Sequence, residues 1–390
     1  MSPSQIQAQA ATTQVAIIGG GLAGLYAACM LERLGTHDYM LLEARDHLGG
    51  RIQSINATEN EPSEAGPDFW LNRFDLGPTW FWPDIQPDLA QVISGLGLER
   101  FAQHEDGDMM VERARGEPPL RMRGYISNPT SMRLVGGMAA LIDALTAKVD
   151  PSRIMTGQTV ARVSATPAHV ELQIRHVSGS TTVLQADHML LALPPRLAAT
   201  TIDFHPPLPG ATANQWRNTP TWMAPHAKYL AVYDAPFWRE QDLSGEGRSW
   251  VGPMAEIHDA SMPGGKAALF GFLGIPAQVR TSTAPDTLKA LCRAQLERLF
   301  GPDAAKPRID FIKDWARDHH TATPADLDGD NAHIQNAPSA LASIAPWNTR
   351  LTGIASEWSP LFAGYLAGAI DAATQGVKTL AAVRQTNRQQ

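Results

Sequence analysis

Cysteine is scarce in this chain. Cys29 and Cys292 are the only two cysteines among its 390 residues. Two thiols so far apart form neither the short spacing of a metal site nor a disulfide framework. The sequence therefore excludes a cysteine-based metal centre and a disulfide-stabilised scaffold, and it fits a reducing compartment.

Long hydrophobic runs are missing as well. No apolar stretch approaches the roughly 20 residues that span a bilayer, and the candidate Met189–Leu193 is only as long as a strand. Residues 1–13 are rich in Gln, Ala, Ser and Thr and lack the basic start and apolar core of a signal peptide. We expect these residues to form a disordered tail, and the protein to be cytoplasmic and free of the membrane.

The chain also lacks an excess of positive charge. It carries 32 Lys and Arg residues against 39 Asp and Glu residues, a net charge of −7, and no basic run of five residues. This balance argues against a nucleic-acid partner. His319 and His320 have no further ligand at metal-binding spacing, so we expect no metal.

Glycine, by contrast, is concentrated in an informative pattern near the N-terminus. Gly19, Gly21 and Gly24 follow the short β-branched run Val15–Ile18 and open a helical pattern over Leu22–Leu34. This spacing is typical of a glycine turn between a strand and a helix, in which the glycines allow a tight turn and let the backbone approach a pyrophosphate closely. The free N–H groups of the helix start favour the same phosphates. The segment predicts a dinucleotide-binding half-fold.

The next strand narrows the choice of dinucleotide. The run Tyr39–Leu42 ends at Glu43, 19 residues after Gly24, where a carboxylate can accept both hydroxyls of an adenosine ribose. Gly49, Gly50 and Arg51 follow as a second glycine turn with a cation, which a nicotinamide-binding unit does not require.

With these residues, the sequence resembles the flavin-dependent amine oxidase family. The resemblance implies a bound FAD, with Gly50 and Arg51 near its pyrophosphate and flavin. It covers nearly the whole chain and assigns cofactor contacts to Gly19, Gly21, Leu22, Ala23, Gly24, Glu43, Ala44, Arg45, Gly50, Arg51, Gly77, Pro78, Thr79, Trp80, Val160, Ser356, Glu357, Tyr365 and Leu366. At Pro78 the chain departs from the second glycine of the family's Asp-Leu-Gly-Gly segment, so local contacts there should differ.

The layout predicts an α/β protein of two domains. A Rossmann-type FAD-binding domain is expected from the discontinuous segments 14–80, 133–217 and 331–385. Its middle segment should contain strands at Thr159–Val163, Val170–His176, Thr182–Gln185 and Asp187–Leu193, the last stopped by two prolines, after a helix that ends near Val149. Residues 81–132 and 218–330 should form a substrate domain with a mixed sheet and helices.

Lys228 is a candidate catalytic residue. Two-residue alternation in Ala227–Tyr233 places Lys228 with Leu230 and Val232 on one largely apolar face of a strand, which predicts burial. The following Pro236-Phe237-Trp238 resembles a family sequence. The resemblance therefore implies that Lys228 is the lysine bridged by water to flavin N5, where a cation would stabilise incipient superoxide.

Tyr365 and Trp315 are the other two catalytic candidates. Gly364–Ala369 matches the family's Gly-Tyr-x-x-Gly-Ala motif, which implies that Tyr365 forms one wall of an aromatic cage over the flavin and that the following helix points its positive end at the ring. Trp315 matches a tryptophan that precedes the second cage segment. The stretch His320–Leu327 has no aromatic residue and no cysteine, so we expect a one-sided cage and non-covalent FAD.

Together these features predict oxidation of a small-molecule amine by hydride transfer to flavin N5, with an imine that hydrolyses to a carbonyl product and with O2 reduced to hydrogen peroxide. The enzymatic alternative is an L-amino-acid oxidase, or a desaturase or porphyrinogen oxidase of the same fold. Residues 77–83 lack the arginine with which related L-amino-acid oxidases hold the substrate carboxylate. A non-catalytic escort protein of the same architecture is the alternative from another class. The oligomeric state stays open, with a homodimer as one candidate.

Overall fold

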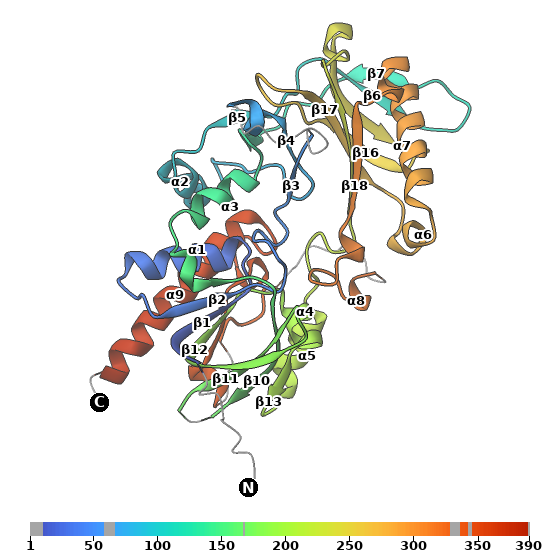
Figure 1. The fold of residues 1–390 in the computed structure, drawn as a ribbon. Coiled ribbons are helices and arrows are strands. Elements are labelled where there is room, and N and C mark those ends of the chain that lie inside the picture. The colour runs from blue at the N-terminus through green and yellow to red at the C-terminus, as the bar shows by residue number, and fades with distance from the viewer. Residues whose placement is uncertain (1–10, 58–66, 167, 328–335, 342–344, 389–390) are drawn as a thin grey trace. The chain divides into compact units, whose positions relative to one another are not determined.

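A computed structural model describes residues 11–57, 67–166, 168–327, 336–341 and 345–388 of the chain (Figure 1). The chain divides into two compact units. The first is built from Met1–Gly50, Leu145–Thr221 and Ala332–Gln390, and the second from Arg51–Ala144 and Trp222–Asn331. Each unit has its own sheet and its own hydrophobic core, and the predicted α/β class is confirmed.

The first unit contains an eight-stranded sheet with a parallel centre. β1 pairs in parallel with β12 on one side and with β2 on the other, which is the arrangement of a Rossmann-type half-fold. The strand order is β13 (Asp203–His205), β10 (Gln158–Ala165), β11 (Val170–His176), β12 (Thr181–Leu191), β1 (Ala11–Ile18), β2 (Tyr39–Leu42) and β9 (Ile154–Met155), and β19 (Leu351–Gly353) also pairs with β12.

The N-terminal strand begins earlier than the sequence indicates. Residues 1–10 of the expected tail lie outside the described residues, but Ala11–Thr13 belong to β1. Their backbones pair with Leu184–Ala186 of β12, so hydrogen bonds to a neighbouring strand order a segment that composition alone marks as polar. The prediction that 11–13 are disordered is therefore wrong.

The middle segment also differs from expectation. The two strands expected at Thr182–Gln185 and Asp187–Leu193 are one strand, β12, which ends at Leu191, before the prolines. The ladder is continuous because Ala186 pairs with Val170 on one side and with Thr13 on the other. The alternation expected in β11 is confirmed, with Val170, Leu172 and Ile174 buried in the core.

The helices of the first unit pack on this sheet and on one another. The glycine segment leads into α1 (Leu22–Arg33), which buries Leu25, Ala27 and Ala28 and packs against α9 (Leu366–Arg388). Gly35, with φ of 71°, follows the C-cap residue Leu34 and ends α1. The other helical segments are α4 (Pro195–Thr201), α5 (Gly210–Asn218), η2 (Pro151–Arg153), η6 (Trp347–Thr349) and η7 (Ser356–Trp358).

The second unit is built on a seven-stranded mixed sheet. Neighbouring strands are antiparallel except for the parallel pair β15 and β6. The order is β18 (Ile309–Asp314), β14 (Ala227–Tyr233), β17 (Ala267–Leu273), β16 (Met254–Asp259), β15 (Leu243–Ser249), β6 (Asp108–Glu112) and β7 (Leu120–Arg123). Two antiparallel two-stranded sheets accompany it, β3 (Ser54–Asn56) with β4 (Arg73–Asp75) and β5 (Arg100–Ala102) with β8 (Met132–Leu134).

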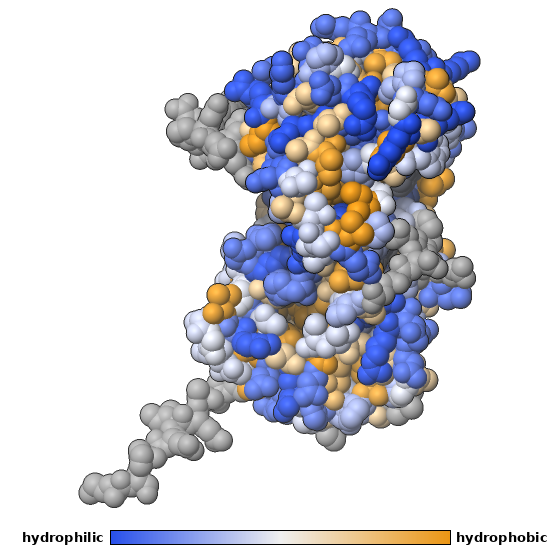
Figure 2. All heavy atoms as spheres, turned by 90° about the vertical axis from the view of Figure 1, so that its right-hand side faces the viewer, coloured by the Kyte–Doolittle hydropathy of each residue, from blue (hydrophilic) through white to orange (hydrophobic). Residues whose placement is uncertain are grey.

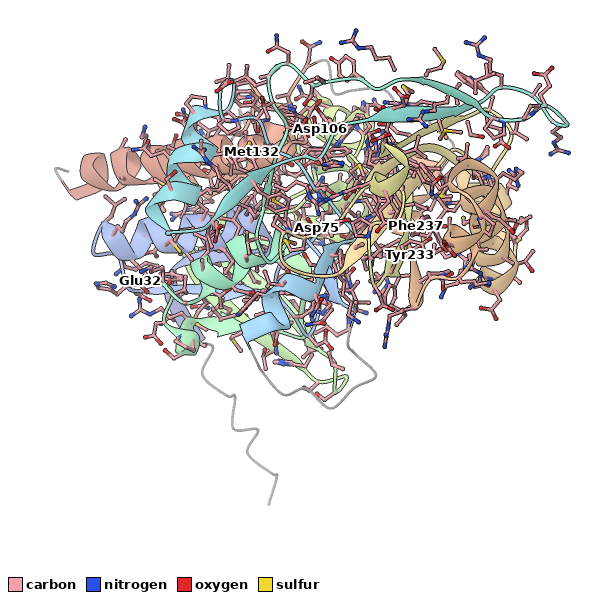
Figure 3. The ribbon with its side chains drawn as sticks, turned by 90° about the horizontal axis from the view of Figure 1, so that it is seen from above. Glu32, Asp75, Asp106, Met132, Tyr233 and Phe237 are labelled. Carbon is pink, nitrogen blue, oxygen red and sulfur yellow. The ribbon has the colours of Figure 1, made fainter. Side chains whose placement is uncertain are left out.

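The two faces of β14 belong to different cores. Tyr229, Ala231 and Tyr233 face a core that α7 (Pro285–Phe300) covers, where Tyr233 meets Phe237 at 5.3 Å between ring centroids (Figure 3). Leu230 and Val232 face the opposite core, as the alternation predicts.

The remaining helical segments are η1 (Pro67–Asn72), α2 (Pro87–Gly95), η3 (Arg239–Gln241), α6 (Ala277–Thr281), η4 (Pro302–Ala305), η5 (Trp315–Arg317) and α8 (Pro324–Leu327).

The compact units divide the chain differently from the expected domains. Residues 51–80 and 133–144, which we expected with the first domain, fall in the second unit. Phe74 and Leu76 pack with Leu230 and Phe270, and Arg133 donates to the backbone of Ala260 and Ser261. The helix α3 (Ala139–Thr146) ends at this boundary, before the expected end at Val149, and its last residues belong to the first unit.

Over the described residues, no helix is long and apolar enough to cross a membrane. On the face drawn in Figure 2, hydrophilic residues surround small groups of hydrophobic ones.

Gly24 gives a direct test of the glycine turn. A Cβ at Gly24 would lie 1.9 Å from the carbonyl oxygen of Gly19, so Gly24→Ala must displace backbone. We expect the substitution to lower the free energy of unfolding by about 1–3 kcal/mol, measured by thermal and denaturant unfolding. Gly95→Ala is the control, because a Cβ there meets no atom within 4 Å. An equal effect of the two substitutions would contradict the proposed contact.

Candidate functional site

The two glycine segments of the first unit lie side by side. Gly19 has φ of 110° and donates to the carbonyl of Leu42 at 2.8 Å. Gly21 bridges Gly49, and a Cβ at Gly50 would lie 3.3 Å from the Cα of Gly21. Side chains at these positions would fill the space next to the turn, so the backbone forms an open cradle that suits a phosphate group.

The start of α1 faces this cradle, and its first N–H groups have no acceptor within the helix itself. Gly21 is the N-cap residue and provides no side-chain hydrogen bond to the helix. Leu22 and Ala23, the first helical residues, are buried. Their backbone N–H groups and the positive end of the helix dipole favour an anion, in accord with a dinucleotide pyrophosphate.

Glu43 lies at the end of β2 and is almost fully buried. Its Oε2 accepts a hydrogen bond from the N–H of Gly20 at 2.7 Å, and its Oε1 accepts one from the N–H of Arg45 at 2.9 Å. A carboxylate has about four acceptor positions, so two remain for the hydroxyls of a ribose. Glu43 thus fixes the glycine turn, and its other acceptor positions suit the ribose hydroxyls for which the sequence makes it a candidate. Ala44 lies between Glu43 and Arg45.

Val160 is placed differently from the other cofactor candidates. Its side chain packs in the core of the first unit, and a bulge lies in β10 between Val160 and Arg162. Only its backbone is suited to a cofactor contact.

The C-terminal candidates surround the start of α9. Ser356 and Glu357 are buried, and the Ser356 hydroxyl donates to the Glu357 carboxylate at 3.1 Å. Tyr365 directly precedes the helix and Leu366 begins it. A Cβ at Gly368 would lie 2.0 Å from the carbonyl oxygen of Phe362, which explains the second glycine of the Gly-Tyr-x-x-Gly-Ala motif.

Lys228 is the central ionisable group of the second unit. Its side chain is 0% exposed. Its Nζ donates to the carbonyl oxygens of Asp75 at 3.1 Å and Gly77 at 2.8 Å, and to the hydroxyl of Thr79 at 2.7 Å. The amine also lies 4.2 Å from the centre of the Phe270 ring. All three N–H bonds of an ammonium are therefore used within the unit, and a bridging water would have to replace one of these acceptors.

Burial changes the ionisation of this group. Loss of hydration lowers the pKa of Lys228 to about 7, although the Asp75 carboxylate favours the charged form. Burial likewise raises the pKa of the Asp75 carboxyl, while hydrogen bonds from Ser54 at 2.6 Å and from the Met138 N–H at 2.8 Å favour its ionised form. Lys228 can thus exist both as an ammonium ion and as a neutral amine near neutral pH.

The loop that accepts from Lys228 is tightly built. A Cβ at Gly77 would lie 2.1 Å from the carbonyl oxygen of Arg51, so this position also requires glycine. The guanidinium of Arg51 donates to the carbonyl of Trp222 at 3.2 Å. Pro78 and Thr79 then turn the chain so that the Thr79 hydroxyl reaches Lys228.

Three aromatic residues follow this loop. Phe81 is fully buried, whereas the Trp80 and Trp82 indoles donate to Gln103 at 2.8 Å and to Ser131 at 3.0 Å. Trp80 lies 5.4 Å from Phe270 between ring centroids, so Trp80 and Lys228 contact the same aromatic residue.

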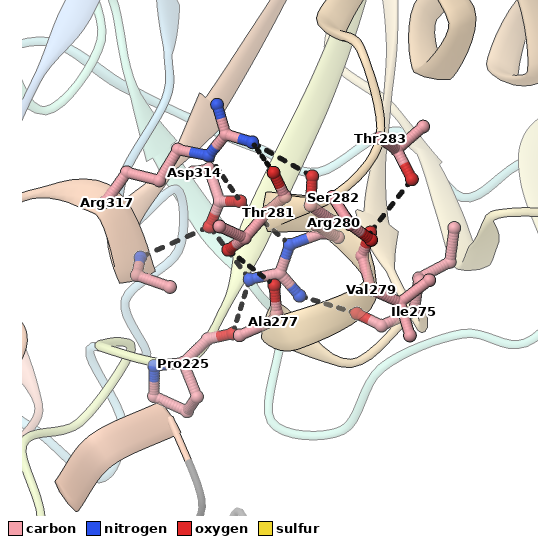
Figure 4. A network of polar contacts seen from close by, with 11 residues as sticks. Pro225, Ile275, Ala277, Val279, Arg280, Thr281, Ser282, Thr283, Asp314 and Arg317 are labelled. Atoms are coloured by element: carbon pink, nitrogen blue, oxygen red, sulfur yellow. Dashed lines mark hydrogen bonds and ion pairs between the residues drawn. The ribbon is translucent and has the colours of Figure 1, made fainter. Parts of the chain in front are cut away.

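Trp315 is 1% exposed and its Nε1 donates to the carbonyl of Leu76 at 3.1 Å. Its neighbour Asp314 forms a bidentate pair with the buried Arg280, at 3.0 and 2.8 Å, and Arg280 also donates to the carbonyl of Pro225 at 2.8 Å (Figure 4). This network ties the end of β18 to the start of β14, so Trp315 supports the loop that accepts from Lys228.

Family models match most of the chain. The model described as flavin containing amine oxidoreductase matches residues 120–374, and that of an NAD(P)-binding Rossmann-like domain matches residues 17–96. The chain belongs to the flavin-containing amine oxidoreductase family. It is thus a flavin-dependent oxidoreductase of the amine oxidase type, as predicted.

Individual relatives agree with this family. A probable flavin-containing monoamine oxidase A from Dictyostelium discoideum is 23% identical over 92% of this chain and 95% of the relative. The flavin-containing amine oxidase B of Canis lupus familiaris is 26% identical over 94% and 85%, respectively.

Two solved structures share the fold. A wild-type putrescine oxidase bound to putrescine has a TM-score of 0.75 at 17% identity and covers 96% of this chain and 100% of its own. Cyclohexylamine oxidase from Brevibacterium oxydans has a TM-score of 0.76 at 18% identity, with 96% and 99% covered.

Three residues that lie around Lys228 were missed by sequence reasoning. The side chain of Asp75 and the rings of Phe270 and Phe272 surround Lys228, with Phe272 5.4 Å from its Nζ. The two-residue alternation in β17 was a usable signal, because Phe270 and Phe272 lie on one face. Pairing of β14 with β17, which sequence does not reveal, sets them beside Lys228.

The lowered pKa of Lys228 makes a prediction for Lys228→Met. Between about pH 7.5 and 9.5, the unfolded lysine is protonated while the folded one, with a pKa of about 7, has lost its proton. The unfolded state then binds more protons, so the stability of the wild type relative to Lys228→Met should rise with pH, by up to about 1.4 kcal/mol per pH unit. Denaturant unfolding at several pH values measures this slope.

The exposed Lys306 supplies the control, since Lys306→Met should show a stability difference that does not change over the same range. If the stability of the wild type relative to Lys228→Met stays constant or falls as the pH rises, the buried lysine keeps its proton and the prediction is wrong.

Proposed function

We propose that this protein is an FAD-dependent oxidase of small-molecule amines that lack an α-carboxylate. When bound, FAD would accept a hydride from the carbon next to the amine nitrogen and pass the electrons to O2, which yields an imine and hydrogen peroxide. Water would convert the imine to a carbonyl compound. The observation that carries the proposal is the fully buried Lys228 amine, held by the Asp75–Thr79 segment in a family whose members use flavin.

The first unit would hold most of the cofactor. A side chain at Gly19 or Gly24 would meet backbone atoms, and the turn leaves backbone donors for the pyrophosphate beside Gly21 and Gly50. Glu43 keeps acceptor positions for the ribose. The remaining proposed contacts are those of Leu22, Ala23, Ala44, Arg45, Arg51, Gly77, Pro78, Thr79, Trp80, Val160, Ser356, Glu357, Tyr365 and Leu366.

Lys228 would act on the oxygen step. Its pKa near 7 allows both a cation, which stabilises incipient superoxide, and a neutral amine. Tyr365 would provide the aromatic wall at the start of α9, and Trp315 would position the Leu76–Gly77 backbone. A cytoplasmic location and a homodimer remain predictions.

The surroundings of Arg73 support the preference for amines over amino acids. Arg73 is the cation nearest in sequence to residues 77–83, which lack an arginine that could bind a substrate carboxylate. Its guanidinium pairs with Asp143 at 2.7 Å and stacks on Trp70 at 4.8 Å. Because Arg73 is already neutralised, it is poorly placed to bind a substrate carboxylate.

The purified holoenzyme should lose its visible flavin absorption when mixed anaerobically with a suitable amine, and admission of O2 should restore the absorption and release peroxide. In Lys228→Met the return of flavin absorption with O2 should slow by about tenfold or more, because removal of one group that stabilises developing charge has an effect of at least this size. The anaerobic loss of absorption should change less.

Lys306→Met, at an exposed position, should behave as the wild type in both phases. A colourless protein that takes up no FAD, or a flavin that no primary amine, secondary amine or polyamine reduces, would contradict the proposed activity.

We also propose that the flavin is bound without a covalent link. The thiols of Cys29 and Cys292 are buried in α1 and α7, and Cys29 donates to the carbonyl of Leu145 at 3.3 Å. Burial raises the pKa of Cys29 to about 11 and also raises that of Cys292, so neither is a reactive thiolate. Acid precipitation should leave the yellow colour in the supernatant; colour that stays with the protein pellet would disprove this.

A further inference from the structure

Two cations and one carboxylate are buried together in the second unit. Asp75 is 6% exposed, Arg133 is 2% exposed and Lys228 is 0% exposed. The Asp75 carboxylate interacts electrostatically with both cations, and the charge of Arg133 also acts on Lys228. Ionisable groups that share one buried site do not set their charges independently, so the ionisation of Lys228 depends on its two neighbours.

Asp75, which is labelled in Figure 3, serves Lys228 in two ways. Its backbone carbonyl accepts a hydrogen bond from the amine at 3.1 Å. Its side-chain Oδ1 accepts from the Ser54 hydroxyl at 2.6 Å and from the Met138 N–H at 2.8 Å, just before α3 begins. Burial raises the pKa of this carboxyl, whereas the two donors and the positive end of the helix favour its ionised form. One residue thus supplies both an acceptor and a negative charge.

Arg133 places a second cation near this pair. Its guanidinium donates to the carbonyls of Ala260 at 2.8 Å and Ser261 at 3.0 Å and lies 5.0 Å from the centre of the Phe101 ring. Its Nε has no hydrogen-bond partner among the residues that the structure describes. Burial lowers the pKa of Arg133, but a guanidinium starts from so high a value that it keeps its proton at neutral pH. Because its direct partners are uncharged, Arg133 opposes a positive charge on Lys228.

The other ionisable groups around Lys228 are paired, uncharged or directed to another acceptor. The ion pairs are Lys313 of β18 with Asp318 at 3.1 Å, Glu256 of β16 with Arg248 at 2.7 Å and with His258 at 2.6 Å, and Arg280 with Asp314 at 2.8 Å. Burial lowers the pKa of His226 to about 4, so its ring is neutral, and Arg51 donates to the carbonyl of Trp222. Within the described residues, the charges that act on Lys228 are therefore those of Asp75 and Arg133.

The hydrogen-bond partners of the Lys228 amine suit both of its ionisation states. An ammonium ion donates to the carbonyls of Asp75 and Gly77 and to the Thr79 hydroxyl. A neutral amine can keep the two carbonyls as acceptors and accept from the Thr79 hydroxyl, because a hydroxyl is both a donor and an acceptor. The amine can thus change its charge while the loop keeps its arrangement, and the neighbouring charges decide which state prevails.

We propose that Asp75 is a positioning residue for the oxygen step, whose carboxylate keeps Lys228 in the ammonium form against the opposing charge of Arg133. The inference rests on the proposed function, in which the ammonium form stabilises incipient superoxide. Asp75 acts through the charge of Lys228 and needs no contact of its own with flavin or substrate.

Asp75→Asn tests the charge alone. Asparagine keeps an oxygen for Ser54 and Met138, and the backbone carbonyl that accepts from Lys228 is unchanged. The measured quantity is the stability of each protein relative to the same protein with Lys228→Met, obtained by denaturant unfolding from about pH 5 to about pH 10. In the wild type this difference should begin to rise near pH 7, where the folded lysine loses its proton.

The two neighbours should move this transition in opposite directions. In Asp75→Asn the rise should begin about one pH unit lower, because the ammonium form has lost its counter-charge. In Arg133→Gln it should begin about one pH unit higher, because the opposing cation is gone. General damage to the fold would not produce shifts of opposite sign, and the Asp75→Asn result stands by itself if Arg133→Gln does not fold.

Two control variants separate this effect from other causes. Asp303→Asn removes a carboxylate at an exposed position, where solvent and salt screen its charge, and should move the transition by less than about 0.3 pH unit. Arg133→Lys keeps the buried positive charge and should restore the transition of the wild type.

The oxygen step gives the second measurement. Flavin in the holoenzyme is reduced by light, without an amine, and its reoxidation by O2 is followed over the same pH range. The rate should fall as the pH rises through the Lys228 transition, and this fall should shift to lower pH in Asp75→Asn and to higher pH in Arg133→Gln.

The outcomes separate this inference from the proposed function. A stability transition that does not move in Asp75→Asn, or that moves equally in Asp303→Asn, overturns the inference even if amines are oxidised. A transition that moves while the reoxidation profile stays fixed overturns the role of Asp75 in the oxygen step. If no amine reduces the flavin, the proposed function fails, but both measurements still decide the inference because neither uses an amine.

Discussion

The structure of the second unit depends on satisfying one buried amine. Lys228 has no access to solvent, so its hydration must be replaced by protein acceptors. Two backbone carbonyls and the Thr79 hydroxyl do this, and all three belong to the short segment Asp75–Thr79. The amine therefore fixes this loop against β14, and the loop cannot relax without leaving a buried polar group unpaired.

Further contacts hold the loop from the other side. Trp315 donates to Leu76, and the Arg280–Asp314 pair fixes the chain just before Trp315. A buried bidentate pair contributes little net stability but is costly to break, so its main effect here is to specify one arrangement of the ends of β14 and β18. Trp80 extends this cluster to Gln103, whose amide donates to the carbonyl of Asp259.

The first unit relies on a different constraint, the close approach of backbone to backbone. Gly24 lies against the Gly19 carbonyl and Gly368 against the Phe362 carbonyl, at distances that a side chain would prevent, and Gly50, with φ of 59°, lies beside Gly21. These contacts come from near neighbours in sequence or from one adjoining turn. For that reason the spacing of the glycines in a single sequence predicts these contacts.

The sequence alone determined the local features: the strand, turn and helix around Gly19–Gly24, the acid at Glu43, the buried alternation around Lys228 and the family. It did not reveal that residues 11–13 pair with β12, that 51–80 join the second unit, or that Phe270 and Asp75 lie around Lys228. Each of these depends on which strands become neighbours, which arises from core packing between residues far apart in the chain. Local patterns follow from interactions between near neighbours in sequence, whereas the burial and the charge around Lys228 depend on the residues that the fold places beside it.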